Sequence, residues 1–194
     1  MMLGKVVKSN GHVDYVCQVY GSGETSSPPS PDDYAFGTFV RIALPDEASL
    51  IGLVYDTILM NPEFGSLGPR LSPSTDLEIF SPDYLREKAV LVGLAAVGQI
   101  AADGSVLQGV PRVAADVDAT VQKLSEAETK SFHQGTPGPR MAYASFLLAQ
   151  GQALTPHLLL RVIEQLEELF PQESQSLSVL RSNLAWKAVI TPAG

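Results

Sequence analysis

The sequence predicts an α+β fold in which a small closed antiparallel β-barrel comes first and a helical segment follows. Short alternating or β-branched runs fill the first two thirds of the chain, and loops rich in Gly, Pro and Ser separate them. A helical period appears only after residue 134. Strands that precede helices are typical of an α+β arrangement. We therefore expect a barrel domain over residues 1–134 and an appendage of about three helices over residues 135–194.

The first two strands are expected at residues 4–9 and 12–20, joined by a hairpin. Asn10-Gly11 favours the positive φ angles of a type I′ turn between them. Alternate residues of the second run are apolar, as in a half-buried strand. That apolar face consists of Val13, Tyr15, Cys17 and Val19.

The next two strands are expected at residues 38–44 and 50–60, with a turn at residues 45–47. Gly52 lies inside the second of them and indicates a bulge or bend, which a closed barrel needs at its corners. Two loops rich in Pro and Gly, at residues 21–33 and 61–76, flank this pair. Long loops on a small sheet are where a binding function would lie.

A further apolar strand, residues 89–100, turns at Asp103-Gly104 into a short partner strand at residues 105–110. The last strand, within residues 116–124, alternates again. Its expected inward residues are Val117, Ala119 and Val121. Ser125 and Glu128 have the spacing of a capping box, which predicts a short helix that ends near His133.

Three more helices are expected at residues 140–150, 155–170 and 173–189. In the second, Thr155 is placed as the N-cap and Pro156 at the first helical position, where its missing N–H costs nothing. Each of the last two helices carries an apolar stripe. The stripe residues are Leu159, Val162, Ile163, Leu166, Leu169 and Phe170 in one, and Leu177, Leu180, Leu184 and Ala188 in the other.

The net charge of −8 disfavours binding to bare nucleic acid and to anionic membrane surfaces. A single cysteine allows no internal disulfide, which fits a reducing compartment. The N-terminus lacks the pattern of a signal peptide, and the longest apolar run, residues 89–102, is shorter than the roughly 20 residues of a bilayer-spanning helix. We expect a soluble, cytoplasmic protein.

The motifs of common catalytic sites are missing from the sequence. No phosphate-binding P-loop is present, and residues 21–26 lack the third glycine of a dinucleotide loop. The three histidines, His12, His133 and His157, are scattered without metal-ligand spacing. Cys17 lies on the strand face opposite His12 and reads as a small buried hydrophobe. We therefore expect no catalytic residue, no cofactor and no metal, and not an enzyme.

The carboxylates are expected to be solvated. Asp32-Asp33 and Asp46-Glu47 read as turn formers, and residues Glu164, Glu167 and Glu168 as the polar face of a helix. Asp56 and Asn61 flank the end of an apolar strand. They could bind a ligand or cap the turn, and we favour capping.

Four short motifs in order resemble the HAS-barrel, the small β-barrel shared by HerA-type DNA translocases and by the N-terminal parts of ATP synthase catalytic subunits. They are Gly4-Lys5-Val6-Val7, Phe36-Gly37-Thr38-Phe39-Val40, Gly52-Leu53-Val54 and Gly109-Val110-Pro111. The likeness covers roughly residues 4–134. It implies a barrel that sits on an oligomeric ring and mediates subunit contacts. The P-loop motor that follows in that family is replaced here by the helical segment, which argues against ATPase or helicase activity. Without the motor, the chain is similar to the stand-alone HAS-barrel proteins of cyanobacteria.

We expect a non-catalytic protein-interaction or oligomerisation module that self-associates or docks on a partner such as a ring-shaped ATPase. The first alternative is a small-ligand binder or enzyme that uses the loops at 21–33 and 61–76. The second is a nucleic-acid accessory protein, which would need a local basic patch around Arg70, Arg86, Lys88 and Arg112. The residues expected to form the interaction surface are Tyr34, Phe36, Phe64, Arg70 and Trp186.

Overall fold

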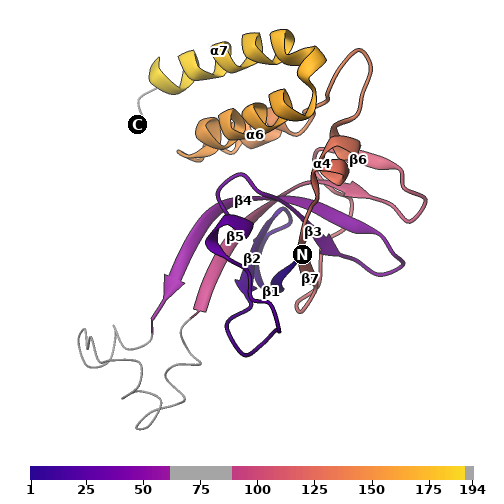
Figure 1. The fold of residues 1–194 in the computed structure, drawn as a ribbon, viewed down its shortest axis with the longest axis vertical. Helices are drawn as coiled ribbons and strands as arrows, with labels where there is room; N and C mark the ends of the chain where they lie inside the picture. Colours follow the sequence, from indigo (N-terminus) through magenta and orange to yellow (C-terminus); the bar gives the residue numbers. More distant parts are fainter. Residues whose placement is uncertain (62–88, 191–194) are drawn as a thin grey trace.

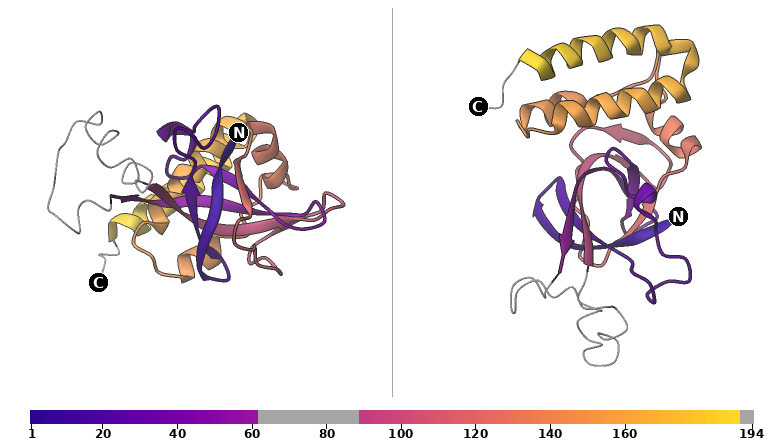
Figure 2. Two further views of the ribbon diagram at one scale, coloured as in Figure 1. Left: turned by 90° about the horizontal axis from the view of Figure 1, so that it is seen from below. Right: turned by 60° about the vertical axis from the view of Figure 1, so that its left-hand side comes forward.

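The computed structural model describes residues 1–61 and 89–190, and the side chains of the last helix as far as residue 185. In this part of the chain six antiparallel strands form a ring in the order β2-β1-β7-β3-β4-β5, which the pairing of β2 with β5 closes. A seventh strand, β6, pairs only with β5. Their bounds are β1 Met2–Gly11, β2 Asp14–Val19, β3 Phe39–Ala43, β4 Ser49–Met60, β5 Ala89–Ile100, β6 Val106–Gln108 and β7 Thr120–Lys123. The predicted closed barrel is therefore confirmed, and Figure 2 shows the ring in cross-section.

The helices follow the barrel in the chain and lie on one side of it (Figure 1). They are α4 Glu126–His133, α5 Ala144–Ala149, α6 Thr155–Leu169 and α7 Ser174–Ile190, with short 3₁₀ turns at Pro31–Asp33 and Pro171–Glu173. Helix α6 packs between the barrel and α7, which forms the outermost layer. The α+β order of strands before helices is thus confirmed, while α5 is shorter than the expected run 140–150.

Strand alternation divides the apolar residues between two cores. One core fills the barrel interior with side chains, as expected for a narrow barrel. Its buried residues are Leu3, Val6, Tyr15, Cys17, Val19, Val40, Ile42, Leu50, Val54, Val92, Leu94, Ala96 and Val121. The predicted inward face of the second strand is therefore confirmed.

The other core lies between the outer wall of the barrel and the helices. Phe39, Ile51, Leu53 and Val97 face outward from the strands and meet Leu159 and its neighbours in the stripe of α6. Because β4 and β5 are covered on both faces over this stretch, their sequences read as nearly continuous apolar runs instead of alternating ones. The helical segment thus shares a core with the barrel wall.

Local irregularities give the barrel its curvature. The β4–β5 register shifts between Ile51 and Gly52, which confirms the bulge expected at Gly52, and shifts again between Val54 and Asp56.

The capping box at Ser125 is also present and starts α4 as expected. The Asp103-Gly104 turn is confirmed, with Gly104 at φ 80°.

The predicted turn between β1 and β2 is wrong by two residues. Gly11 pairs with Asp14, so His12 and Val13 form the turn, and neither Asn10 nor Gly11 has a positive φ. Two contacts fix this arrangement: the Tyr15 hydroxyl donates to the His12 carbonyl at 2.9 Å, and the His12 ring lies 2.9 Å from the Pro111 carbonyl. The positive φ angles occur in the next hairpin instead, at Asp46 and Glu47 (59° and 62°), where the sequence has no glycine.

Three expectations near the helices also need correction. Val117 is 66% exposed, because Asp118 adopts a φ of 66° and interrupts the alternation that leads into β7. Thr155 is the first residue of α6 and is buried, while Leu154 occupies the N-cap without a side-chain cap. In α7, Leu177 and Leu184 are buried but Leu180 is 40% exposed, because α7 contacts the protein through one side only.

Candidate interaction surfaces

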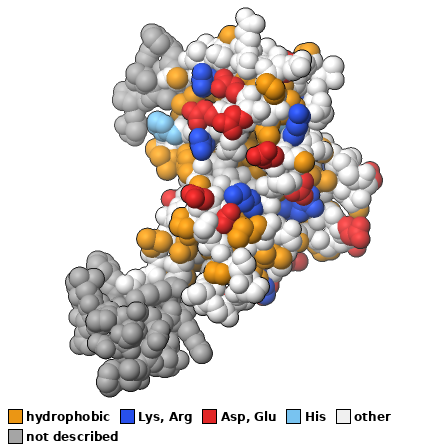
Figure 3. Space-filling view, viewed as in Figure 1, with side chains coloured by type: hydrophobic (Ala, Val, Ile, Leu, Met, Phe, Trp, Pro, Cys, Tyr) orange, Lys and Arg blue, Asp and Glu red, His pale blue; other side chains and the backbone are white. Residues whose placement is uncertain are grey.

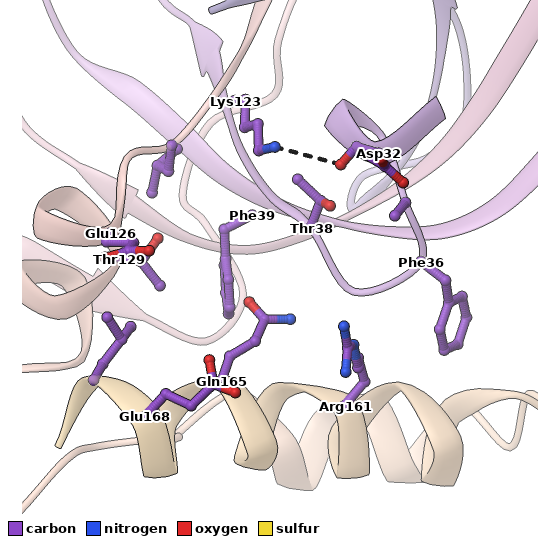
Figure 4. A pocket seen from close by; sticks show the side chains of 13 residues that line it. Asp32, Phe36, Thr38, Phe39, Lys123, Glu126, Thr129, Arg161, Gln165 and Glu168 are labelled. Carbon is purple, nitrogen blue, oxygen red and sulfur yellow. Dashed lines mark hydrogen bonds between the residues drawn. The ribbon is translucent and has the colours of Figure 1, made fainter. Parts of the chain in front are cut away.

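A cleft of about 290 Å³ lies where the barrel meets α6 (Figure 4). The short turn Pro31–Asp33, the start of β3, the end of β7, α4 and α6 all contribute side chains to it. Its lining residues are Asp32, Ala35, Phe36, Thr38, Phe39, Lys123, Leu124, Glu126, Thr129, Arg161, Gln165, Glu168 and Leu169. Their positions in the sequence are far apart, and the docking of α6 on the barrel brings them together.

The cations of the cleft have partners within the chain. Lys123 Nζ lies 3.1 Å from Asp33 Oδ1 and donates to the Asp32 carbonyl at 3.3 Å. Arg161 pairs with Glu164 at 3.1 Å. The pKa of Asp33 is lowered, first by hydrogen bonds from Ser30 and then by Lys123. These pairs neutralise the positive charge at the cleft, which weakens it as a site for an anionic ligand.

A backbone contact also links the two walls of the cleft. Gln165 Nε2 donates to the Gly37 carbonyl at 3.0 Å. Gly37 has a φ of 87°, which favours glycine, and a Cβ there would lie 2.8 Å from Arg161 Cγ. The segment that leads into β3 can therefore pass close to α6 only with glycine at this position. The cleft is therefore part of the joint that holds α6 against the barrel. Figure 3 shows acidic and basic side chains interspersed over this face of the molecule.

The far ends of β4 and β5 form a second feature, which we call the ribbon: residues 55–60 of β4 with residues 89–93 of β5. The two strands stay paired to Met60–Ala89, while β5 also pairs with β2 as far as Leu91, so only their last residues extend beyond the barrel (Figure 1). Three consecutive apolar side chains of β4 are exposed there, Ile58 at 48%, Leu59 at 76% and Met60 at 50%. Exposed apolar residues that cluster in this way mark interaction surfaces in folded proteins.

The three histidines and the cysteine lie apart from one another, and the two that are buried have shifted pKa values. His133 is fully buried, and burial lowers its pKa to about 4. His157 is exposed on α6, and His12 contacts Pro111. Burial raises the pKa of Cys17 to about 12, so its thiol stays protonated at neutral pH and reads as the predicted small hydrophobe. Among the residues that the structure describes, no group of three or more His, Cys, Asp or Glu side chains could hold a metal ion.

The predicted surface residues lie in different places. Tyr34 is half-buried against the barrel interior, and Phe36 is half-buried against the helical core and lines the cleft. Phe64 and Arg70 lie outside the described residues. Trp186 lies within α7, beyond the part whose side chains are described. The structure thus places Phe36 at the cleft but does not bring the five residues into one described surface.

The charged residues of the other hypotheses are only partly described. Arg112 is exposed, while Arg70, Arg86 and Lys88 lie outside the described residues, so the basic patch stays a prediction. The acidic face of α6 needs one correction: Glu167 pairs with Arg181 of α7 at 3.1 Å, and its side chain is only 18% exposed. Asp56 lies within β4, where it accepts a hydrogen bond from the neighbouring Thr57 N–H at 2.8 Å, so the expectation that it flanks the strand end and caps a turn is wrong.

Sequence reasoning identified neither surface as such. The cleft depends on the docking of α6, which no local pattern encodes. The ribbon did leave a signal, because a strand over residues 50–60 is longer than its partner at 38–44. The difference in length implies that the last residues of the longer strand lack a neighbour on one side.

Two comparisons with known proteins complete the description. A family model described as "Domain of unknown function (DUF8166)" matches residues 1–193. The search of curated proteins found no match.

In the described part of the chain, no helix is long and apolar enough to cross a membrane.

Proposed function

We propose that this chain, which belongs to the DUF8166 family, acts as a non-catalytic protein-interaction or oligomerisation module. The observation that carries the proposal is the contrast between the inside and the outside of the barrel. Apolar side chains fill the interior, whereas the ribbon places three consecutive apolar side chains in solvent. Because apolar side chains occupy the described interior of the barrel, its outer surface is the part that we propose for recognition.

The titratable groups support the same proposal. Among the described residues whose pKa values are shifted, the largest causes are burial and local hydrogen bonds, as for Cys17, Asp33 and His133. A general acid or base would instead need a shifted group that opens into a cleft. His133 has the shift but is fully buried, and its two ring nitrogens already have protein partners.

The resemblance to the HAS-barrel extends this proposal to a class of partner. A barrel of that type would dock on a ring-shaped ATPase supplied by another chain, since the present sequence has no P-loop. The closed antiparallel ring is compatible with such a barrel. Its role would be to regulate or position the ring without hydrolysing nucleotide itself.

The proposal is tested by affinity capture of the full-length native protein, followed by mass spectrometry and light scattering on the purified chain. We expect either a stable complex with a specific protein or concentration-dependent self-association. A double substitution in the ribbon, Ile58→Ser with Leu59→Ser, should weaken the association. The matched control is Leu154→Ser, since Leu154 is also 50% exposed but lies before α6. A monomer at all concentrations that captures no protein would contradict the proposal.

A small-ligand binder is the second candidate, and the cleft is the observation that favours it. Phe36 and Phe39 provide apolar walls there, and Lys123, Arg161 and Gln165 provide polar ones. Backbone amide shifts of residues 32–38 and 161–169, followed by NMR during titration with a small-molecule library, would test it. Saturable shifts confined to these residues would favour the binder over the interaction module.

A further inference from the structure

The outer edge of the ribbon has no neighbouring strand among the described residues. Strand β3 pairs with β4 from Ser49 to Leu53, and the Thr38 carbonyl continues the contact to the Val54 N–H at 3.0 Å. Beyond Val54 the only strand beside β4 is β5, on the other side. Residues 55–60 therefore form a sheet edge that could accept another strand.

Both faces of this part of β4 are also uncovered. Residues 56–60 are all exposed, although side chains of neighbouring residues point to opposite faces of a strand. The β5 side of the ribbon is supported, since β5 pairs with β2 as far as Leu91 and Val92 is buried in the barrel interior, so the open side is that of β4. An added strand would cover apolar surface and pair the open edge at the same time.

The edge carries few of the features that usually prevent edge-to-edge pairing. Natural edge strands are protected by lysine, proline or inward-pointing charges. Residues 55–60 contain no lysine and no proline, and Asp56 is their single charged residue. Asp56 accepts a hydrogen bond from the Thr57 N–H at 2.8 Å, which places that N–H on the open side of the strand instead of in the β5 ladder. The two-residue period of a strand places the Leu59 N–H on the same side.

We propose that a second copy of this chain occupies the edge, with the two β4 strands antiparallel and Ile58 close to a two-fold axis. This inference rests on the proposed function and names its contact surface. In this register Thr57 of one copy pairs with Leu59 of the other, and both of these residues have outward-facing backbone groups. The two Ile58 side chains then meet at the axis, and Leu59 lies across from the Thr57 methyl group.

The charge pattern favours a second copy as the occupant. In the proposed register each Asp56 lies opposite Met60 of the other copy, so the two carboxylates do not face each other. Like charges placed directly opposite would destabilise the pair. The edge is therefore complementary to itself, and two-fold pairing satisfies both edges at once without leaving a new one.

The proposed interface between the two copies is short, and its small size limits the affinity of the dimer. An interface built on six residues of each chain falls below the size of standard stable complexes, so the dimer should be weak and reversible. Each copy carries a net charge of −8, which opposes association through the field of the whole molecule. Added salt should therefore strengthen the dimer by screening this repulsion, the reverse of what an ion-paired interface would show.

The test is sedimentation equilibrium of the full-length protein from micromolar to near-millimolar concentration, at low and at moderate salt. The informative variant is Leu59→Pro, which removes an outward N–H and an apolar side chain while leaving the β5 ladder intact. Leu59→Thr is the matched control that keeps the N–H. We expect the wild type to dimerise, the proline variant to lower the association constant by at least about tenfold, and the threonine variant to lower it less.

Amide hydrogen exchange locates the contact independently of these variants. The amides of Thr57 and Leu59 should become protected as concentration rises, while the exposed face of α7 should not change. A dimer without that protection, or one unaffected by Leu59→Pro, would overturn the proposed edge but not the interaction module. A strictly monomeric protein that still captures a different protein would likewise refute the dimer alone, and a monomer that captures nothing would refute both.

Discussion

His133 Nε2 lies 2.7 Å from the hydroxyl of Tyr143, and both residues are fully buried. The other ring nitrogen, Nδ1, lies 2.7 Å from the carbonyl oxygen of Thr129. Because a carbonyl can only accept, Nδ1 carries the proton and donates it, and Nε2 accepts from the Tyr143 hydroxyl. The pair connects α4 to the start of α5, within the core that joins the helices to the barrel wall.

This buried imidazole makes stability depend on pH. Burial lowers the pKa of His133 from 6.5 to about 4, so between these values the unfolded chain binds the proton more readily than the folded one. The part of the free energy of unfolding that depends on a neutral His133 is fully present above about pH 6.5. It is lost as the pH falls toward 4. Urea unfolding should show a loss of about 2 kcal/mol from this residue on going from pH ~7 to pH ~5. The His133→Gln variant should lack this part of the slope.

His157→Gln is the control for the loss of a histidine as such, because His157 is exposed on the surface of α6. If His133→Gln kept the full wild-type slope between pH ~5 and pH ~7, another group would be responsible.

Tyr143→Phe tests the other half of the pair. The substitution removes the only hydroxyl that donates to His133 Nε2 and leaves a buried acceptor unsatisfied. We expect a loss of about 1–3 kcal/mol in the free energy of unfolding. A double-mutant cycle with His133→Leu should give a coupling energy of at least about 0.5 kcal/mol, because the Tyr143 hydroxyl no longer stabilises the fold through this hydrogen bond when the imidazole is absent. Additive effects would mean that the hydrogen bond adds nothing to stability.

Features encoded by neighbouring residues were predictable from the sequence. The Ser125 capping box places all its donors and acceptors within four residues, and β5 has the bounds expected from its apolar residues, Ala89–Ile100. The individual strands, too, followed from their apolar patterns, whereas the closure of the barrel joins residues far apart in the chain, β2 with β5. The capping box and the individual strands depend on local backbone preferences, which the sequence records directly.

Features that depend on distant contacts were not predictable in the same way. The Asn10-Gly11 pair has strong turn chemistry, but contacts of Tyr15 and of Pro111 with His12 place the turn two residues later. Val117 fits the alternation of β7 and is nevertheless exposed. The cleft requires Lys123 of β7 and Gln165 of α6 to line one cavity at the joint between the barrel and α6, and a single sequence contains no signal for that arrangement.

Gly93 allows one aromatic side chain to lie across the barrel seam. Tyr55, at the second β4 bulge, covers Gly93 of β5, and its hydroxyl donates to Asp14 Oδ1 of β2 at 2.7 Å. A Cβ at position 93 would lie 2.8 Å from Tyr55 Cζ. Gly93→Ala should therefore destabilise the protein by about 1–3 kcal/mol in chemical unfolding.

The matched control is Gly11→Ala, where a Cβ would meet nothing within 4 Å. Its effect should stay within about 0.5 kcal/mol. In a Tyr55→Leu background the cost of Gly93→Ala should fall, because the aromatic ring is the group that the new methyl displaces. An unchanged cost in that background would show that backbone preference, and not the ring, sets the requirement for glycine.

Ser125 supports the helix that borders the cleft. Its Oγ accepts from the Glu128 N–H at 3.3 Å, and Glu128 Oε2 accepts from the Ser125 N–H at 2.8 Å. Hydrogen bonds that the Ser125 N–H and hydroxyl donate to the Glu128 carboxylate, followed by the charge of Arg41 at 3.0 Å, lower the pKa of Glu128. Ser125→Ala should cost about 1 kcal/mol in urea unfolding. Ser131→Ala, on the exposed side of α4, should be neutral or slightly stabilising.

Glu128→Gln separates the cap from the ion pair, because glutamine can still accept from the Ser125 N–H while losing the charge that attracts Arg41. Since the pair is partly exposed, we expect a cost of at most about 0.5 kcal/mol at neutral pH. The folded pKa of Glu128 is depressed, so its stabilisation is present above the unfolded value and is lost as acid protonates the folded carboxylate. The variant should therefore lose less stability than the wild type on acidification below about pH 4.5. If Glu128→Gln cost as much as Ser125→Ala at neutral pH, the contact with Arg41 would be the main support of this helix.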